Sequence, residues 1–130
     1  MPVFDDADVE ALVGCLAEDA YYNTGQDCTA PCRVVAGPGV YDRLLGDLGD
    51  AVGGLDVGDP TLEDTAVGPL VSAAQRERVA GMVSRAVEAG AELVAGGEVI
   101  DGPASSTRRR WSRTRGRTPR WCSARCSARW

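Results

Sequence analysis

Residues 21–33 read YYNTGQDCTAPCR, and they separate an apolar helical pattern from a short β-branched run. The stretch places Cys28 shortly after Gly25, the residue at which the helical periodicity stops. A thiolate is intrinsically a strong nucleophile and needs only modest activation, so Cys28 is a candidate catalytic group. The alternative is a buried and inert thiol, because a free cysteine often packs as a small hydrophobe.

The residues before this stretch predict a helix over 5–22. Its apolar positions recur at helical spacing and are Val9, Leu12, Val13, Leu16 and Ala20. The acidic cluster of Asp5, Asp6 and Asp8 could indicate a metal site, but the acidic first turn of a helix is the simpler interpretation. Cys15 lies on the apolar stripe, and we therefore expect it in the core.

The residues after the stretch predict a buried strand over 33–36, which is closed by Gly37-Pro38-Gly39. Cys32 stands at the start of this strand, where we expect it to pack rather than react. A second helix is predicted over 40–52, with Val40, Leu44, Leu48 and Val52 on one stripe. The glycines at 46 and 49 each cost such a helix about 1 kcal/mol relative to alanine.

The second half of the chain begins with a turn-rich loop over 53–69 and then contains the clearest helix. Ser72 and Gln75 form a capping-box pair at its start, and Gly90 is placed to end it in the left-handed conformation. The apolar stripe of this helix consists of Val79, Met82, Val83, Ala86 and Val87. A short strand over 91–95 follows, so the order of elements indicates α/β architecture.

Five blocks of the sequence resemble the aldehyde dehydrogenase superfamily in the family's own order. PVFDDADVEALV resembles the segment before the catalytic cysteine, and YYNTGQDC resembles the active-site motif. GVYDRLLGDL, LDVGDPTLEDTAVGPLVS and RVAGMVSRAVEAGAELVAGGE match later blocks. One motif alone would be weak, whereas the ordered set over residues 1–103 is specific. GQDCTAPCR is most similar to the aminoaldehyde dehydrogenases, notably the γ-aminobutyraldehyde type.

The resemblance implies a partial aldehyde dehydrogenase catalytic domain in which Cys28 attacks a small aldehyde. The oxyanion would be held by the cysteine's own backbone N–H and an Asn side chain, and hydride would pass to NAD or NADP. A Glu-activated water would then hydrolyse the thioester. Asp27 could face a substrate ammonium, although a solvated loop acid is the simpler interpretation, and Thr29 is a second candidate for substrate binding. The parent enzyme would be homo-oligomeric.

The resemblance also implies that the family's nucleotide-binding domain, its oxyanion Asn and its Glu base lie before this segment. Gly96 and Gly97 follow a predicted strand but do not make a dinucleotide fingerprint. We therefore expect that this chain does not itself bind NAD or NADP. On this interpretation the chain is an inactive truncated remnant of the enzyme.

The net charge of −5 conceals a sharp division along the chain. Residues 1–103 carry all 19 acidic residues and five arginines, whereas residues 104–130 carry nine arginines and no acid. The basic segment could be a nucleic-acid-binding arm with stacking Trp residues, which gives a small acidic binding module as the alternative function. Cys122 and Cys126 are two ligands without a histidine, which is too few for a zinc site.

A shifted reading frame explains the basic segment better. Written in GC-rich codons and read in another frame, the tail gives FFYPPTVVADARPDAEVVQREVFGPV, which resembles the family's next block. We therefore divide the chain into a partial catalytic domain over 1–103 and an out-of-frame, disordered Arg/Trp-rich tail over 104–130. Such a tail would have no nucleic-acid partner.

Several classes of protein are disfavoured by composition. No apolar run approaches the roughly 20 residues that span a bilayer, and no signal peptide is visible. The chain contains no His, which excludes a Cys-His dyad within it. The five cysteines form no disulfide framework, and we expect reduced thiols, a cytoplasmic location and no membrane partner.

Overall fold

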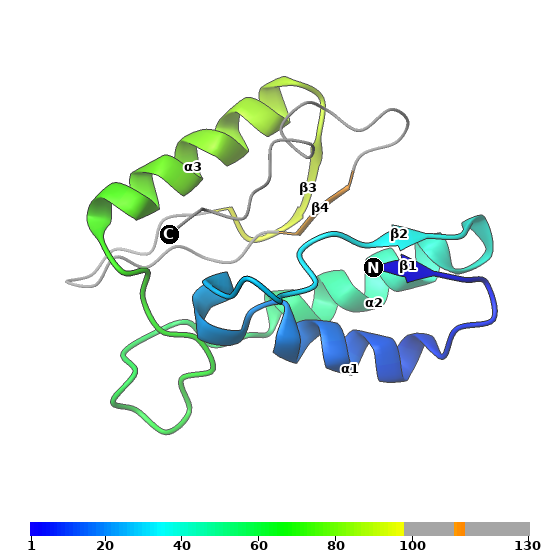
Figure 1. The fold of residues 1–130 in the computed structure, drawn as a ribbon, viewed down its shortest axis with the longest axis horizontal. Helices are drawn as coiled ribbons and strands as arrows, with labels where there is room; N and C mark the ends of the chain where they lie inside the picture. The colour runs from blue at the N-terminus through cyan, green and yellow to red at the C-terminus, as the bar shows by residue number, and fades with distance from the viewer. Residues whose placement is uncertain (98–110, 114–130) are drawn as a thin grey trace.

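The structure is a computed structural model that describes residues 1–97 and 111–113. Its elements are β1 (Pro2–Val3), α1 (Val9–Asp19), the 3-10 helix η1 (Tyr22–Gly25), β2 (Val35–Ala36), α2 (Pro38–Gly53), α3 (Ala73–Glu88), β3 (Glu92–Ala95) and β4 (Trp111–Arg113). Strand β1 pairs in parallel with β2, and β3 pairs in antiparallel fashion with β4. Figure 1 shows α1 and α2 lying together, with α3 on the other side of β3. The predicted α/β class is confirmed.

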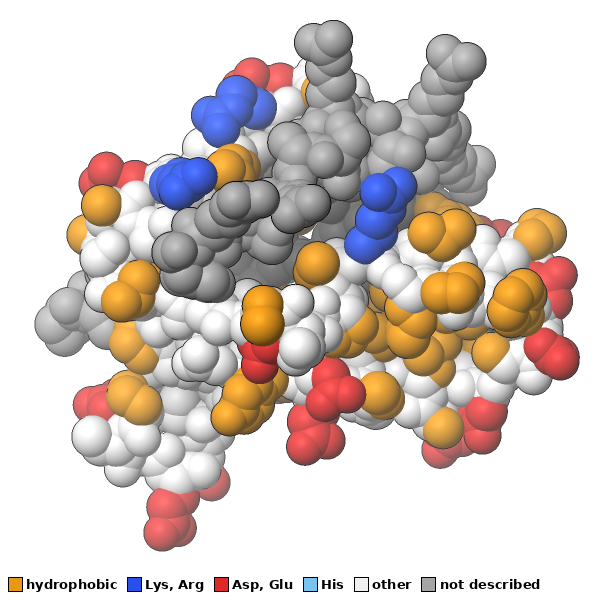
Figure 2. All heavy atoms as spheres, viewed as in Figure 1, with side chains coloured by type: hydrophobic (Ala, Val, Ile, Leu, Met, Phe, Trp, Pro, Cys, Tyr) orange, Lys and Arg blue, Asp and Glu red, His pale blue; other side chains and the backbone are white. Residues whose placement is uncertain are grey.

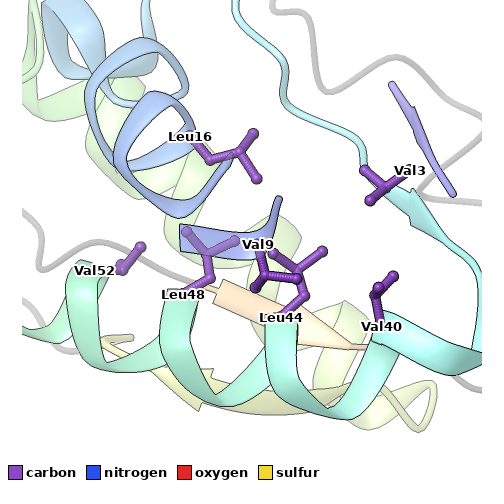
Figure 3. Packing of buried hydrophobic residues seen from close by; sticks show 7 residues of the cluster. All are labelled: Val3, Val9, Leu16, Val40, Leu44, Leu48 and Val52. Atoms are coloured by element: carbon purple, nitrogen blue, oxygen red, sulfur yellow. The ribbon is translucent and has the colours of Figure 1, made fainter. Parts of the chain in front are cut away.

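The core lies between α1, α2 and β1. Its buried members are Val3, Val9, Leu16, Val40, Leu44, Leu48 and Val52. Figure 3 shows the side chains of α2 directed toward those of α1 and β1. Leu16 and Leu48 are only 1% and 2% exposed, and burying a leucine contributes about 1.5–3 kcal/mol. The predicted stripes of the first two helices therefore meet each other.

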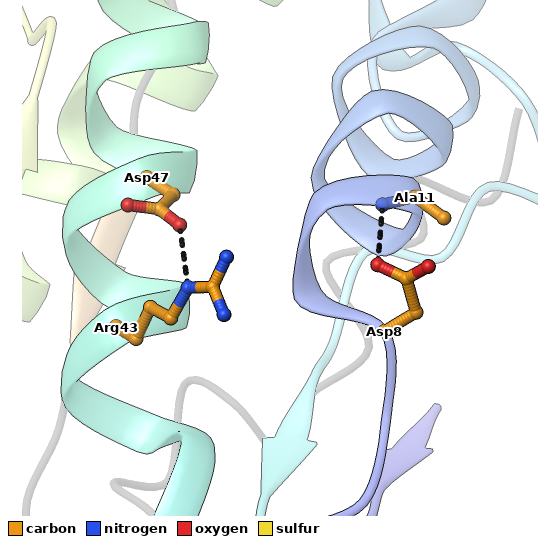
Figure 4. Close-up of polar contacts among 4 residues, drawn as sticks. All are labelled: Asp8, Ala11, Arg43 and Asp47. Carbon is orange, nitrogen blue, oxygen red and sulfur yellow. Dashed lines mark hydrogen bonds and ion pairs between the residues drawn. The ribbon is translucent and has the colours of Figure 1, made fainter.

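The acidic cluster near the N-terminus caps two different helices. Helix α1 begins at Val9 rather than at residue 5, because the Asp8 carboxylate accepts a hydrogen bond from the Ala11 N–H at 3.2 Å (Figure 4). Asp5 lies outside α1, and its Oδ1 accepts the Gly39 N–H at 2.9 Å in the first turn of α2. Each carboxylate satisfies an N–H that the helix itself leaves unpaired. The expected single acidic turn is therefore wrong.

Three glycines are explained by close approaches. A Cβ on Gly39 would lie 2.9 Å from the Asp5 Cγ, and a Cβ on Gly37 would collide with the Asp5 Oδ1. Both glycines therefore make room for the capping carboxylate. Inside α2, a Cβ on Gly49 would lie 3.0 Å from the Val94 Cγ1. This glycine, which weakens the helix, lets β3 pack close against it.

The N-terminal residues form a strand that the sequence pattern did not indicate. The β1–β2 register aligns Val3 with Ala36, and the Val35 N–H donates to the Met1 carbonyl at 2.9 Å. The predicted buried strand over 33–36 is shorter than expected, and the Val35 side chain is exposed. Hydrophobic side chains gather on the surface over this region (Figure 2), and Phe4 is 73% exposed.

Helix α3 has the predicted ends but a different environment. The Ser72 Oγ accepts the Gln75 N–H at 3.2 Å, and Gly90 has φ +93°, as the sequence predicted. Its apolar stripe is only partly covered, since Ala86 is the buried residue of α3 and Val87 is 43% exposed. The reason is that the core cluster is drawn from β1, α1 and α2. None of the described helices is long and apolar enough to cross a membrane.

The predicted disordered tail is described at three residues only. Trp111–Arg113 form β4, whose register places Arg113 opposite Glu92, and the expectation of a disordered tail stays a prediction for the rest of residues 104–130. Pairing with a neighbouring strand orders a backbone that has no periodicity of its own. The junction at Pro103–Ala104 and the pair Cys122 and Cys126 lie outside the described residues.

The α1–α2 interface predicts a large effect for Leu48→Ala. Removing this buried side chain should lower the free energy of unfolding by about 2–5 kcal/mol, because transfer and cavity costs add. Leu62→Ala is the matched control, since Leu62 is 63% exposed and its truncation should change stability by less than about 0.5 kcal/mol. Urea denaturation followed by circular dichroism measures both, and equal losses would contradict this core.

Candidate active site

Cys28 lies in the turn that follows η1, with its thiol exposed. Cys15 and Cys32 are free and exposed as well. The expectations that Cys15 belongs to the core and that Cys32 packs are therefore wrong. Val9 and Leu16 define the buried face of α1, and Cys15 is rotated from Leu16 by about 100° around the helix.

A neighbouring carboxylate distinguishes Cys15 from the other thiols. Its Sγ donates a hydrogen bond to the Asp19 Oδ2 at 3.1 Å. This hydrogen bond, with smaller contributions from desolvation and the negative charges of Asp19 and Glu18, raises the pKa of the Cys15 thiol. Less thiolate is present at a given pH, so Cys15 is a poorer nucleophile than an ordinary cysteine.

The predicted site residues on either side of Cys28 bind each other. The Asp27 Oδ1 accepts hydrogen bonds from the Thr29 N–H and the Thr29 Oγ1, both at 2.7 Å. The turn therefore closes around Cys28. The bond from the Thr29 N–H, followed by that from its hydroxyl, lowers the pKa of Asp27 below its usual value. Asp27 is thus a carboxylate at every pH at which an ordinary thiol ionises.

A pocket of about 250 Å³ opens beside this turn. Its lining consists of Asp19, Tyr22, Asp27, Thr29, Ala30 and Pro31. Cys28 stands between two of the lining residues in the sequence. The Tyr22 ring is 66% exposed, and two carboxylates line the same space. An aromatic ring and negative charges are groups that attract a cation. Sequence reasoning did not single out Asp19 or Tyr22, because only the turn brings them next to Asp27.

A larger open cavity of about 680 Å³ lies against α1, η1 and the loop before α3. Its lining includes Gly14, Tyr21 and Val67, with Glu18 as the charged member. Neither Asp27 nor Thr29 is part of it. We take the smaller pocket as the candidate site, because Asp27 and Thr29, the sequence neighbours of Cys28, line it.

The described residues do not fit a dinucleotide. The β2–α2 junction has a strand, a glycine turn and a helix N-terminus, which is the arrangement that binds pyrophosphate. Here the Asp5 carboxylate already accepts the Gly39 N–H, and its charge would oppose a phosphate. The β1–α1 junction is likewise capped by Asp8. No step through NAD or NADP can be assigned to this part of the chain.

Comparison with known proteins identifies the protein family. The model of the Aldehyde dehydrogenase family matches residues 1–108. Lactaldehyde dehydrogenase from Escherichia coli is 41% identical over 101 residues, which cover 77% of this chain and 21% of that protein. Betaine aldehyde dehydrogenase 2 from Rhizobium meliloti is 46% identical over 93 residues, which cover 72% of this chain and 19% of that protein.

The fold gives the same result. The crystal structure of lactaldehyde dehydrogenase from Escherichia coli matches with a TM-score of 0.82 and 37% identity, over 85% of this chain and 24% of that one. An α/β segment with this fold is therefore part of an oxidoreductase catalytic domain. The chain belongs to the aldehyde dehydrogenase family, whose members depend on NAD(P). It spans about a fifth of the length of these curated relatives, and the family is favoured over an acidic binding module.

The Cys15–Asp19 contact yields a test of thiol reactivity. Asp19→Asn should speed alkylation of Cys15 by iodoacetamide at mildly alkaline pH, because the charge that holds its pKa high is removed. Peptide-resolved mass spectrometry measures the rate at each cysteine. Asp47→Asn removes an equal charge from the exposed Arg43–Asp47 pair and should leave Cys15 unchanged. A similar acceleration in both variants would show that net charge, not the contact, sets the reactivity.

Proposed function

We propose that this chain carries the nucleophile-bearing segment of an NAD(P)-dependent aldehyde dehydrogenase and that Cys28 is the nucleophile. The observation that carries the proposal is the free, exposed thiol of Cys28, whose backbone lies in the turn closed by the hydrogen bonds between Asp27 and Thr29. The Cys28 thiolate attacks the aldehyde carbonyl carbon and forms a C–S bond. The π electrons of the carbonyl move to its oxygen, which takes a proton from water, so the product is a hemithioacetal.

The backbone of the turn supports this addition. The Thr29 N–H is bound by Asp27, whereas none of the described residues accepts a hydrogen bond from the Cys28 N–H. That N–H is therefore available to donate to the oxyanion that develops beside the sulfur. Acceptance of hydride and activation of the hydrolytic water require groups that the described residues do not supply. We propose that this chain performs the addition without redox turnover.

Aldehyde addition can be measured without a cofactor. A small aldehyde should slow the alkylation of Cys28 by iodoacetamide while leaving Cys32 unaffected, because Cys28 lies between the lining residues Asp27 and Thr29, whereas Cys32 follows the last lining residue of this segment, Pro31. Addition of NAD or NADP should produce no reduced cofactor. Peptide-resolved mass spectrometry and cofactor absorbance give the two readouts. Equal protection of Cys28 and Cys32, or reduction of cofactor that Cys28→Ser abolishes, would contradict the proposal.

We further propose that the substrate class is a cationic aldehyde, with aminoaldehydes such as γ-aminobutyraldehyde as the expected members. Asp19, Asp27 and Tyr22 supply two negative charges and an aromatic face beside Cys28. The name of one relative contains betaine aldehyde, which carries a quaternary ammonium, whereas the name of another contains lactaldehyde, which is uncharged. The names of relatives therefore do not decide the substrate, and the acidic pocket carries the proposal.

The proposed recognition of a positively charged aldehyde by Asp27 can be tested with a pair of matched aldehydes. Betaine aldehyde should protect Cys28 better than its uncharged isostere, in which carbon replaces nitrogen, and Asp27→Asn should lower this preference by about three- to tenfold. The asparagine Oδ1 still accepts the bonds from Thr29, so the turn is kept. Because the pKa of Asp27 is lowered, the preference should persist as the pH falls through the usual range of aspartate.

The chain contains a matched control for this variant. Asp59 makes the same pair of bonds to the Thr61 N–H and Oγ1, at 2.9 and 2.8 Å, and these bonds likewise lower its pKa. Asp59→Asn removes the same charge from the same kind of turn, away from the pocket beside Cys28. An equal loss of preference in Asp59→Asn would show that Asp27 has no specific role.

We also propose that residues 104–130 are an out-of-frame tail on a cytoplasmic, homo-oligomeric parent lineage. The support is the shift from acidic to basic composition and the family match, which ends at residue 108. Sequencing the DNA of this region tests the idea. A single uninterrupted frame that encodes the Arg-rich tail in several independent isolates would overturn it.

A further inference from the structure

The turn before Cys28 has a strained backbone. Asn23, Thr24 and Gly25 have φ of 47°, 62° and 70°, so three successive residues are left-handed. Each residue with a Cβ costs about 1–2 kcal/mol in this conformation, and a β-branched residue such as Thr24 is rarely found there. Such a conformation persists only where surrounding contacts fix it.

Two side chains of the turn reach a segment far away in the sequence. The Thr24 Oγ1 donates a hydrogen bond to the Gly68 carbonyl at 3.1 Å. The Gln26 Oε1 accepts the Val71 N–H at 3.1 Å. These bonds join positions that are 44 and 45 residues apart, one from within the strained backbone and one from the residue that follows it.

Gln26 also closes the turn from within. Its Nε2 donates to the Asn23 carbonyl at 3.1 Å, while the Asn23 Nδ2 donates to the Gln26 carbonyl at 3.2 Å. The amide of Gln26 therefore uses its oxygen on the remote segment and its nitrogen on the turn. Replacing the Gln26 side chain would therefore remove its bond to the Val71 N–H and its bond to the Asn23 carbonyl together.

The remote segment over 68–71 is itself fixed at its two ends. Val67, which precedes it, is 4% exposed, and its N–H and carbonyl bond to the Asp56 carbonyl and the Gly58 N–H, both at 3.0 Å. Ser72, which follows it, is the N-cap of α3. The segment is therefore a rigid partner for the turn rather than a free loop.

We propose that Thr24 and Gln26 are positioning residues for Cys28, which they hold in place through the 68–71 segment. The bonds between Asp27 and Thr29 fix the shape of the turn around the thiol, but they are local. Within the described residues, the hydrogen bonds of Thr24 and Gln26 tie the turn to a distant part of the fold. The inference rests on the proposed role of Cys28, and neither residue touches the aldehyde itself.

Placement matters here because the thiol must face the acidic pocket and its own N–H at once. Displacement of a reacting group by about 1 Å can reduce reactivity by up to about a hundredfold. We call the bonds from Thr24 to Gly68 and from Val71 to Gln26 the clamp. Removing the clamp should therefore reduce aldehyde addition at Cys28 without altering the reactivity of Cys15 or Cys32, which lie outside the residues that it joins.

The experiment compares Thr24→Val and Gln26→Ala with the full wild-type chain. Each variant should weaken the protection of Cys28 by betaine aldehyde about tenfold, while the alkylation rates of Cys15 and Cys32 stay the same. Thr24→Ser keeps the hydroxyl and should restore most of the protection. Thr24→Gly relieves the left-handed strain but lacks the hydroxyl, so it should remain impaired even if the chain becomes more stable.

Thr65→Val is the matched control, because the Thr65 Oγ1 donates to the Asp59 carbonyl at 2.7 Å within the same loop but away from Cys28. Unchanged protection in Thr24→Val and Gln26→Ala would overturn the proposal. Equal loss in Thr65→Val, or a joint change at all three cysteines, would also overturn it. If wild-type Cys28 binds no aldehyde, the proposed function fails, and the iodoacetamide rate at Cys28 alone still tests the clamp.

Discussion

The packing of α1 on α2 is the interaction on which the rest of the described structure depends. Among the described residues, Leu16 and Leu48 are the largest side chains that are fully buried, and both belong to the core cluster. Because α1 leads directly into η1, this packing sets where the Cys28 turn begins. The same packing brings Asp5 to the start of α2, where it accepts the Gly39 N–H.

Carboxylates have structural tasks throughout this acidic chain. Asp8 caps its own helix, Asp5 caps the next one, and Asp27 and Asp59 each close a turn through a threonine two residues on. In each case an oxygen accepts a backbone N–H that regular structure leaves free. Asp27 differs from the others because its turn encloses a thiol and lines a pocket. The same Asp–Thr turn thus occurs at Asp59, where it serves the fold alone, and at Asp27, where it lies beside Cys28.

Much of the local structure could be predicted from sequence. Helical spacing located all three helices, Ser72 and Gly90 marked the ends of α3, and the GQDC motif led to Cys28. The predictions failed where the outcome depends on which other element packs against a residue. Cys15 has helical spacing close to the stripe, yet it faces solvent and Asp19. Strand β1 carries no pattern of its own and exists because β2 pairs with it.

The sequence by itself determined the family and singled out Cys28 as the proposed nucleophile, because both reside in residue types at fixed short spacings. Only the tertiary structure decided which thiols are exposed, that Asp19 and Tyr22 share a pocket with Asp27, and that Thr24 and Gln26 are tied to Gly68 and Val71. The physical reason is the separation along the chain between the residues that interact. Capping, turn and helix preferences act over a few residues, whereas burial depends on elements that lie far apart along the chain, and the bonds of Thr24 and Gln26 join positions 44 and 45 residues apart.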